Sequence, residues 1–177
     1  MKYIEPNQKI ILDACCGGRT FWFNKKHPNA IYIDNRIRPK GFVKQRPNFE
    51  VKPDELGDFT KLQFPDKCFK LVVWDPPHLI RKTPELGWPT QKYGSFPKQT
   101  WKQDLTLGFQ ECWRVLEDYG VLIFKWSSGE KRLADILDLF SEQPLFGHTT
   151  NRGTTHWLCF MKIPKAIKQA EAPDTLL

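Results

Sequence analysis

The sequence lacks any run of about 18 consecutive apolar residues, the length that a membrane-spanning helix requires. Its first residues, Met1-Lys2-Tyr3-Ile4-Glu5-Pro6, also lack the apolar region of a secretory signal peptide. These two absences predict a soluble protein of the cytoplasm that is not associated with a membrane.

Metal-binding and disulfide patterns are equally scarce. The sequence has five cysteines but no C-x-x-C pair, and no histidine stands at metal-ligand spacing from them. We therefore expect small, buried, reduced side chains, with neither a zinc site nor a disulfide framework. The cysteines are Cys15, Cys16, Cys68, Cys112 and Cys159.

The length of the chain indicates how many domains it forms, and its charge indicates what kind of partner it binds. The chain has 177 residues, 40% of them hydrophobic, and we expect one domain over 1–163 followed by a polar tail over 164–177. The 27 Lys and Arg residues against 20 Asp and Glu give a formal net charge of +7. This positive charge favours a polyanionic partner such as nucleic acid.

Short apolar runs alternate with segments of helical spacing along most of the chain. Leu105, Phe109 and Cys112, for example, recur at the spacing of one helical face. This alternation predicts an α/β fold, a Rossmann-like, seven-stranded, mostly parallel sheet with helices on both faces. The expected strands are 9–13, 30–34, 49–52, 71–74 and 121–125, and the expected helices are 19–26, 101–118 (stopped by Gly120) and 131–140.

The last two expected strands, 146–148 and 156–163, follow one another with no helix between them. Their linker, 149–155, is rich in turn-forming residues. We therefore expect an antiparallel C-terminal hairpin that completes the sheet.

Three of the expected strands end in an acid, at Asp13, Asp34 and Asp75. Ligands of open α/β sheets bind at the carboxyl ends of strands, so these acids are candidate site residues. Asp13 is followed by Ala14-Cys15-Cys16-Gly17-Gly18, a bend of small residues whose N–H groups can approach a ligand closely. The bend lacks the G-x-G-x-x-G and G-x-x-x-x-G-K-[ST] patterns of nucleotide phosphate sites. An acid at its start suits a cationic ligand better than a phosphate.

The stretch Asp75-Pro76-Pro77-His78 directly follows the apolar run Leu71-Val72-Val73-Trp74. Proline fixes φ and favours extended geometry in the residue before it, so the Asp75 carboxylate and the Pro76 carbonyl should be held at the end of a strand. These two rigid acceptors, beside the flat ring of His78, suit a planar amino group. Taken alone, the four residues are equally consistent with a strand-ending turn and a solvated acid.

The segment 79–102 is long for a connection between a strand and a helix. Its basic residues outnumber its one acid, Glu85, and aromatic residues are interleaved with them. This composition is typical of phosphate contacts combined with base stacking, although a surface loop with incidental charge is the alternative. The candidate substrate-binding residues are Arg81, Lys82, Lys92, Tyr93 and Lys98.

These motifs, in this order, resemble those of class I S-adenosylmethionine-dependent methyltransferases over residues 9–162. Within that family the chain is similar to amino-methyltransferases, whose signature is Asp/Asn/Ser-Pro-Pro followed by an aromatic residue. It is most similar to small phage-type DNA methyltransferases with an Asp-Pro-Pro-His version. Two positions depart from the pattern: Cys15 stands where a glycine is usual, and His78 where Tyr, Phe or Trp is more frequent.

The resemblance implies S-adenosyl-L-methionine as the cofactor and gives roles to individual residues. Residues around its methionine part would be Asp13, Ala14, Cys15, Cys16, Gly17 and Gly18, with Asp34 on the ribose and Asp58 and Phe59 at the adenine. The catalytic motif would be Asp75, Pro76, Pro77 and His78, with His78 against the face of the target base.

The resemblance also implies methyl transfer to an exocyclic amino nitrogen of a nucleobase, with N6 of adenine in DNA favoured. The same chemistry on RNA or on cytosine N4 is an alternative, as is methylation of a protein glutamine amide or of a small molecule. A nucleic-acid-binding or cofactor-sensing module with an inactive site is the non-enzyme alternative, although no strand-end acid is missing. A phage-encoded protein of this kind would act in the host cytoplasm.

Overall fold

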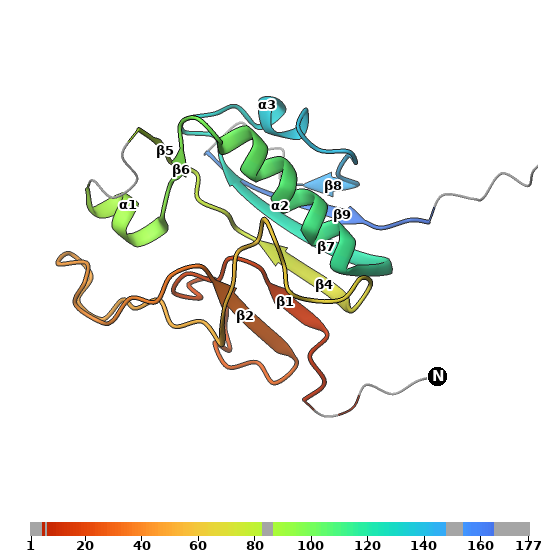
Figure 1. Cartoon of the computed structure of the whole chain (residues 1–177), viewed down its shortest axis with the longest axis horizontal. Helices are drawn as coiled ribbons and strands as arrows, with labels where there is room; N and C mark the ends of the chain where they lie inside the picture. Colours follow the sequence, from red (N-terminus) through yellow and green to blue (C-terminus); the bar gives the residue numbers. More distant parts are fainter. Residues whose placement is uncertain (1–4, 6, 83–86, 148–153, 165–177) are drawn as a thin grey trace, which may run out of the picture.

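The computed structural model describes residues 5, 7–82, 87–147 and 154–164. Within them, seven strands form one sheet in the order β3-β2-β1-β4-β7-β9-β8, and a separate two-stranded ladder joins β5 to β6 (Figure 1). The strands are β1 Ile11–Asp13, β2 Ala30–Asp34, β3 Glu55–Leu56, β4 Phe69–Trp74, β5 Ile80–Arg81, β6 Phe96–Pro97, β7 Leu116–Ser127, β8 Phe146–Gly147 and β9 Thr155–Met161. The helices are α1 Trp88–Tyr93, α2 Trp101–Val115 and α3 Leu133–Leu137.

The central strands β1, β4 and β7 run parallel and in a fixed register. Leu12 lies opposite Val72, and Val72 lies opposite Leu122. The bends that follow these strands therefore leave the sheet at one end, where α1, β5 and β6 also lie (Figure 1). The carboxyl ends of these strands therefore lie together, as the sequence predicted.

The closing hairpin is antiparallel, as predicted. Cys159 of β9 lies opposite Ile123 of β7 on one side and Phe146 of β8 on the other. The predicted α/β class, with a mostly parallel seven-stranded sheet, is thus confirmed. Residues 148–153 of the linker and 165–177 of the predicted tail lie outside the described residues.

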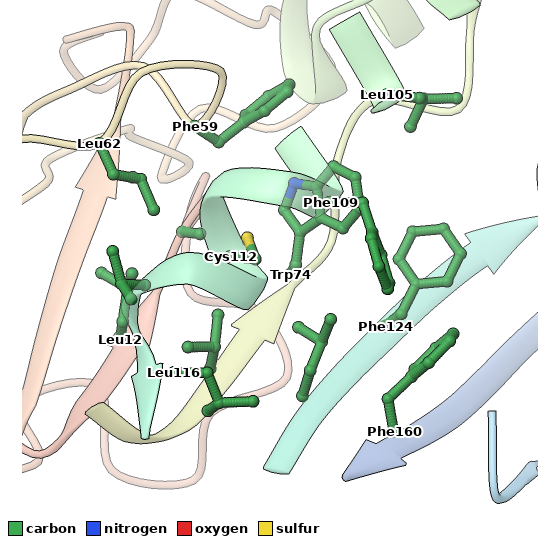
Figure 2. Packing of buried hydrophobic residues seen from close by; sticks show 14 of the residues in the cluster. Leu12, Phe59, Leu62, Trp74, Leu105, Phe109, Cys112, Leu116, Phe124 and Phe160 are labelled. Atoms are coloured by element: carbon green, nitrogen blue, oxygen red, sulfur yellow. The ribbon is translucent and has the colours of Figure 1, made fainter. Parts of the chain in front are cut away.

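One face of the sheet packs against α2 and the segment around α3. Figure 2 shows Phe109 on α2 lying against Trp74 and Phe124 of the sheet. The Phe109 ring stacks on Phe140 with centroids 4.3 Å apart, and Phe140 meets Phe124 edge-on. The helical face predicted from residue spacing is therefore the buried face of α2.

The other face, over β1 and β2, is covered by a loop where we expected a helix. The helix predicted for 19–26 is wrong, because this segment forms turns and Arg19 has a φ of 52°. Trp22 packs edge-on against Tyr32, and its indole N–H donates to Asp13 at 2.7 Å. These side-chain contacts fix turns in a stretch whose consecutive aromatic residues have no helical spacing.

Helix α2 ends at Val115, earlier than the predicted 118, and Gly120 is not its stop. The ammonium of Lys162 donates to the carbonyls of Trp113 and Leu116, at 2.6 and 2.7 Å. The backbone N–H of Cys68 donates to Val115 at 2.8 Å. These donors satisfy the last helical carbonyls, so the chain passes directly from α2 into β7.

Three further boundaries differ from the prediction. The helix expected over 131–140 is limited to α3, and the strand expected over 49–52 is reduced to a single bridge between Val51 and Arg38. The third strand is β3, and the segment 79–102, which is long for a connection between a strand and a helix, contains α1, β5 and β6. Across the described ranges, no helix combines the length and the apolar character needed to cross a membrane.

Replacing Phe109 by alanine should lower the free energy of unfolding by about 3–5 kcal/mol, the usual range for a buried phenylalanine. Phe109 is 1% exposed, and its ring contacts Phe140, Trp113 and Phe160. Urea denaturation measures the loss. Leu107→Ala is the matched control, because Leu107 lies on the same helix but is 37% exposed. Equal losses in the two variants would contradict the packing of α2.

Candidate active site

A cavity of about 350 Å³ opens at the carboxyl edge of the sheet, between the bend after β1 and the motif after β4. Its wall combines part of the small-residue bend, the whole Asp-Pro-Pro-His motif and two of the candidate substrate-binding residues in the basic segment 79–102. These residues are Cys15, Cys16, Gly17, Gly18, Asp75, Pro76, Pro77, His78, Lys92 and Tyr93. The fold therefore brings together three candidate segments that lie far apart in the sequence.

The bend after β1 is fastened to both neighbouring strands. The N–H of Ala14 donates to Val73 of β4 at 2.9 Å, and the N–H of Cys16 donates to Ile33 of β2 at 2.8 Å. Backbone hydrogen bonds of this kind fix the path of the chain without using side chains. The bend is therefore held in place before any ligand arrives.

The two glycines of the bend are favoured for different reasons, backbone conformation at Gly17 and close packing at Gly18. Gly17 has a φ of 48°, in the left-handed region that favours glycine, and its N–H donates to Asp34 at 2.9 Å. At Gly18, an added Cβ would lie 2.3 Å from the ring of Phe49. A side chain at Gly17 would meet a strained backbone, and one at Gly18 would displace the Phe49 ring, which also lines the cavity.

Asp75 is held by two neighbours within the cavity. Its Oδ2 accepts from the Lys125 ammonium at 2.7 Å, and its Oδ1 lies 3.1 Å from Nε2 of His78. Lys125 reaches Asp75 from β7, the neighbouring strand. A carboxylate has about four lone-pair sites, so acceptor capacity remains for a ligand N–H.

His78 is fixed from two sides. Its Nε2 lies 3.1 Å from Oδ1 of the Asp75 carboxylate. Its ring also packs edge-on against Trp126, with centroids 5.0 Å apart and planes at 78°. The ring lines the cavity, and its stacking on a base stays a prediction.

Asp13 lies behind the bend and is fully buried. Burial raises its pKa from 3.8 to about 7, although hydrogen bonds from the Trp22 indole and the Cys15 N–H act in the opposite direction. The negative charges of Asp75 and Asp34 raise this pKa further. Asp13 therefore titrates near neutrality, where a nearby cation would favour its ionised form.

Asp34 is buried and has both oxygens engaged. One accepts from the N–H of Gly17 at 2.9 Å, and the other from the backbone N–H and Nε of Arg36, at 3.0 and 3.2 Å. Arg36, rather than Asp34, forms part of the cavity wall. In this structure Asp34 secures the bend, and its predicted contact with a ribose stays a prediction.

A second cavity, of about 380 Å³, adjoins the first. The two share the wall residues Cys15, Arg36 and Pro77. Asn35 and Phe59 also line the second cavity. Asp58 does not line it, because its carboxylate accepts from the N–H and the hydroxyl of Thr60, both at 2.8 Å. Of the pair expected at an adenine, only Phe59 faces a cavity.

The basic segment contributes unevenly to the site. Lys92 lies 2.8 Å from the Tyr93 hydroxyl and lines the first cavity. The guanidinium of Arg81 forms an ion pair with Glu130, so its charge is already balanced. Lys82 and Lys98 are exposed and line neither cavity.

Arg36 and Lys125 line the cavity but were not among the predicted site residues. Lys125 is the only charged residue in the apolar run 121–126, which is the signal that could have identified it. Arg36 gave no comparable signal beyond its closeness to the strand-end acid Asp34. Together they add two positive charges to a wall that contains the carboxylate of Asp75.

The cysteine side chains are free thiols. Burial raises the pKa of Cys15, Cys16 and Cys112 above the usual value for a thiol, so these residues stay protonated and act as small packing groups. Among the described residues, no cluster of three His, Cys, Asp or Glu side chains could hold a metal ion.

Asp13 should contribute a fall in the free energy of unfolding as the pH rises from about 4 to about 7. Its pKa is about 7 in the folded protein and has an ordinary value of 3.8. Between these values the folded protein keeps a proton that the unfolded chain has lost, so rising pH favours unfolding. Urea denaturation across this window, in wild type and in Asp13→Asn, measures the effect. Asparagine cannot lose a proton, so the fall in stability contributed by Asp13 should be absent from the variant's curve, and equal slopes in the two proteins would contradict a raised pKa at Asp13.

No family model matches the sequence, and no curated protein matches it. Solved structures do match, and one is the PH0226 protein from Pyrococcus horikoshii OT3, 14% identical, with a TM-score of 0.50 over 87% of this chain and 81% of that chain. A TehB-like SAM-dependent methyltransferase from Corynebacterium glutamicum is 16% identical, with a TM-score of 0.47 over 89% and 82% of the chains. A SAM-dependent methyltransferase from Aquifex aeolicus is 14% identical, with a TM-score of 0.45 over 86% and 81%. At this identity, the likeness to the PH0226 protein shows the fold alone.

Proposed function

We propose that this chain is an S-adenosylmethionine-dependent methyltransferase that acts on an exocyclic amino nitrogen of a nucleobase, with N6 of adenine in DNA as its target. One observation carries the proposal: Asp75 and Pro76 line the same cavity as Gly17 and Gly18. One wall of the cavity thus offers hydrogen-bond acceptors for an amino group, and the other has a glycine backbone that a ligand can approach closely. A methyl donor and an amino acceptor can meet in that space.

The two adjoining cavities suit the two ends of S-adenosylmethionine. Gly17 and Gly18 leave room beside the methionine end, and Asn35 and Phe59 line the cavity that suits the adenosine end. Cys15 lines both cavities and would lie near the junction of the two halves. When bound, the cofactor supplies an electrophilic methyl group on a sulfonium.

The chemistry follows from the weakness of the nucleophile. The exocyclic nitrogen of adenine donates its lone pair into the ring and is barely basic. Asp75 and the Pro76 carbonyl would each accept one N–H, which would turn the nitrogen toward tetrahedral geometry and aim its lone pair at the methyl group. The N–CH3 bond would form as the S–CH3 bond of the donor breaks, and one N–H proton would then pass to solvent. Lys125 and His78 hold the Asp75 carboxylate at 2.7 and 3.1 Å, so this acceptor is positioned before the substrate binds. Such preorganisation supplies most of the acceleration.

Charge and position support a nucleic-acid substrate. The chain carries a formal charge of +7, and Lys92 and Tyr93 line the cavity beside the catalytic motif. Lys82 and Lys98 are exposed on the same segment of the chain. Cations next to aromatic rings can follow a phosphate backbone and stack on bases. The preference for DNA rests on the resemblance of the Asp-Pro-Pro-His motif to that of DNA methyltransferases.

Asp75→Ala should abolish methyl transfer and leave the affinity for S-adenosylmethionine within a few-fold of wild type. The carboxylate acts on the acceptor nitrogen, whereas the bend residues lie on the donor side. Transfer of a radiolabelled methyl group to DNA measures the first effect, and calorimetric titration with the cofactor measures the second.

Asp118→Ala is the matched control for Asp75→Ala. Asp118 is a partly exposed acid paired with Lys67, before the segment of β7 that reaches the cavity. This variant should transfer methyl groups at the wild-type rate. A near wild-type rate in Asp75→Ala would show that the proposed mechanism is wrong.

Joint replacement of Lys92 and Lys98 by methionine should weaken DNA binding and flatten its salt dependence. Each lost phosphate contact removes about 0.9 from the slope of log affinity against log salt concentration. The double variant Lys67→Met and Lys70→Met is the control, since it removes the same charge from residues paired with Asp118 and Glu117. An unchanged slope in the first variant would exclude Lys92 and Lys98 as phosphate contacts.

A further inference from the structure

Phe23 stands out on the loop 14–29, between β1 and β2, because its relative exposure is 110%. Its neighbours Phe21 and Trp22 are partly buried, so the chain hides two aromatic rings and presents the third. A single exposed apolar residue is common on protein surfaces and says little alone. Three further features of Phe23 point to a function: the contacts that hold its loop, the position of the loop beside the cavity, and the positive charge of the loop.

The backbone on both sides of Phe23 is held rigidly. The guanidinium of Arg19 donates to the carbonyls of Lys25 and Lys52, at 2.6 and 2.9 Å, and lies 3.8 Å from the centre of the Tyr32 ring. The hydroxyl of Tyr32 donates to the carbonyl of Asn24 at 3.2 Å. Phe23 is therefore projected outward by a fixed loop.

The loop also forms one wall of the catalytic cavity. Thr20 and Phe21 line that cavity, and the Phe21 ring packs edge-on against Trp157 at 5.4 Å. Two residues of chain span at most about 7 Å, so the backbone of Phe23 lies close to this wall. Phe23 is thus a fully exposed side chain that follows, by two residues, a wall of the cavity containing Asp75.

The charge of the loop indicates an anionic partner. Residues 19–29 include no acid, and Lys25 and Lys26, which follow Phe23 closely, are exposed. One aromatic ring and two lysines give only a weak hold on a membrane surface. Next to a cavity suited to a base, the same groups fit a nucleic-acid duplex better.

We propose that Phe23 is a wedge that enters the base stack of a duplex and occupies the space that the target base leaves. Lys25 and Lys26 contact the phosphates beside it. The inference rests on the proposed function, because a base that reaches Asp75 must first leave its stack. Apolar side chains inserted between base pairs compensate for this loss of stacking.

The test compares methyl transfer to unmethylated duplex DNA of mixed sequence with transfer to the same DNA after heat denaturation. Phe23→Ala should lower kcat/KM on the duplex by about tenfold or more, and on the single strands by less than about threefold, since the latter have no paired stack to open. Phe23→Trp should retain most of the duplex activity. Phe146→Ala is the matched control, because Phe146 is a 68% exposed phenylalanine on β8, and both activities should stay at wild-type levels.

Three results would overturn the wedge: wild-type duplex activity in Phe23→Ala, an equal loss on both substrates, or an equal loss in Phe146→Ala. Binding of the wild-type protein, but not of Phe23→Ala, to phosphatidylserine vesicles in place of DNA would overturn it by assigning the loop to a membrane surface. Absence of methyl transfer to either DNA by the wild-type protein would instead remove the proposed function. That outcome is separate, because it does not depend on Phe23.

Discussion

The parallel register of β1, β4 and β7 is the constraint on which the candidate site depends. Asp13 lies opposite Val73, and Val73 lies opposite Ile123. Asp75 and Lys125 each come two positions later, which places their side chains next to each other on the same face. A slip of one residue would turn one of them to the opposite face and break the 2.7 Å contact between them. The apolar packing that fixes this register therefore also fixes the position of the Asp75 carboxylate.

Three acids that look equivalent in the sequence have different environments in the structure. Asp13 is buried behind the bend, with a pKa near neutrality, and Asp34 is engaged by the N–H of Gly17 and by Arg36. Only Asp75 faces the cavity, where Lys125 balances its charge. The first two acids shape the bend, and the third is available to a substrate. All three acids lie at strand ends, and the contacts of each carboxylate determine its role.

Local patterns predicted the sheet, the reversed last strand and the cavity residues Gly17, Gly18 and Asp75, because each is set by nearby residues: apolar runs, glycines and prolines. These patterns gave wrong predictions where contacts between distant residues determine the local structure. The segment 19–26 forms turns because Trp22 bonds to a distant acid, and α2 stops early because Lys162 satisfies its carbonyls. Lys125 was missed as a site residue for the same reason, since its partner Asp75 comes from another strand. Arg36 was missed although its partner Asp34 is only two residues away, because no sequence pattern marked its position.

The most direct measurement is mass spectrometry of the nucleosides released from DNA and RNA after incubation with the wild-type protein and a donor that carries a deuterated methyl group. The account predicts deuterium in N6-methyldeoxyadenosine and in no other nucleoside. Label on a ring carbon or a ring nitrogen would contradict an acceptor pair built for an exocyclic amino group. Absence of label from every nucleoside would contradict the account as a whole.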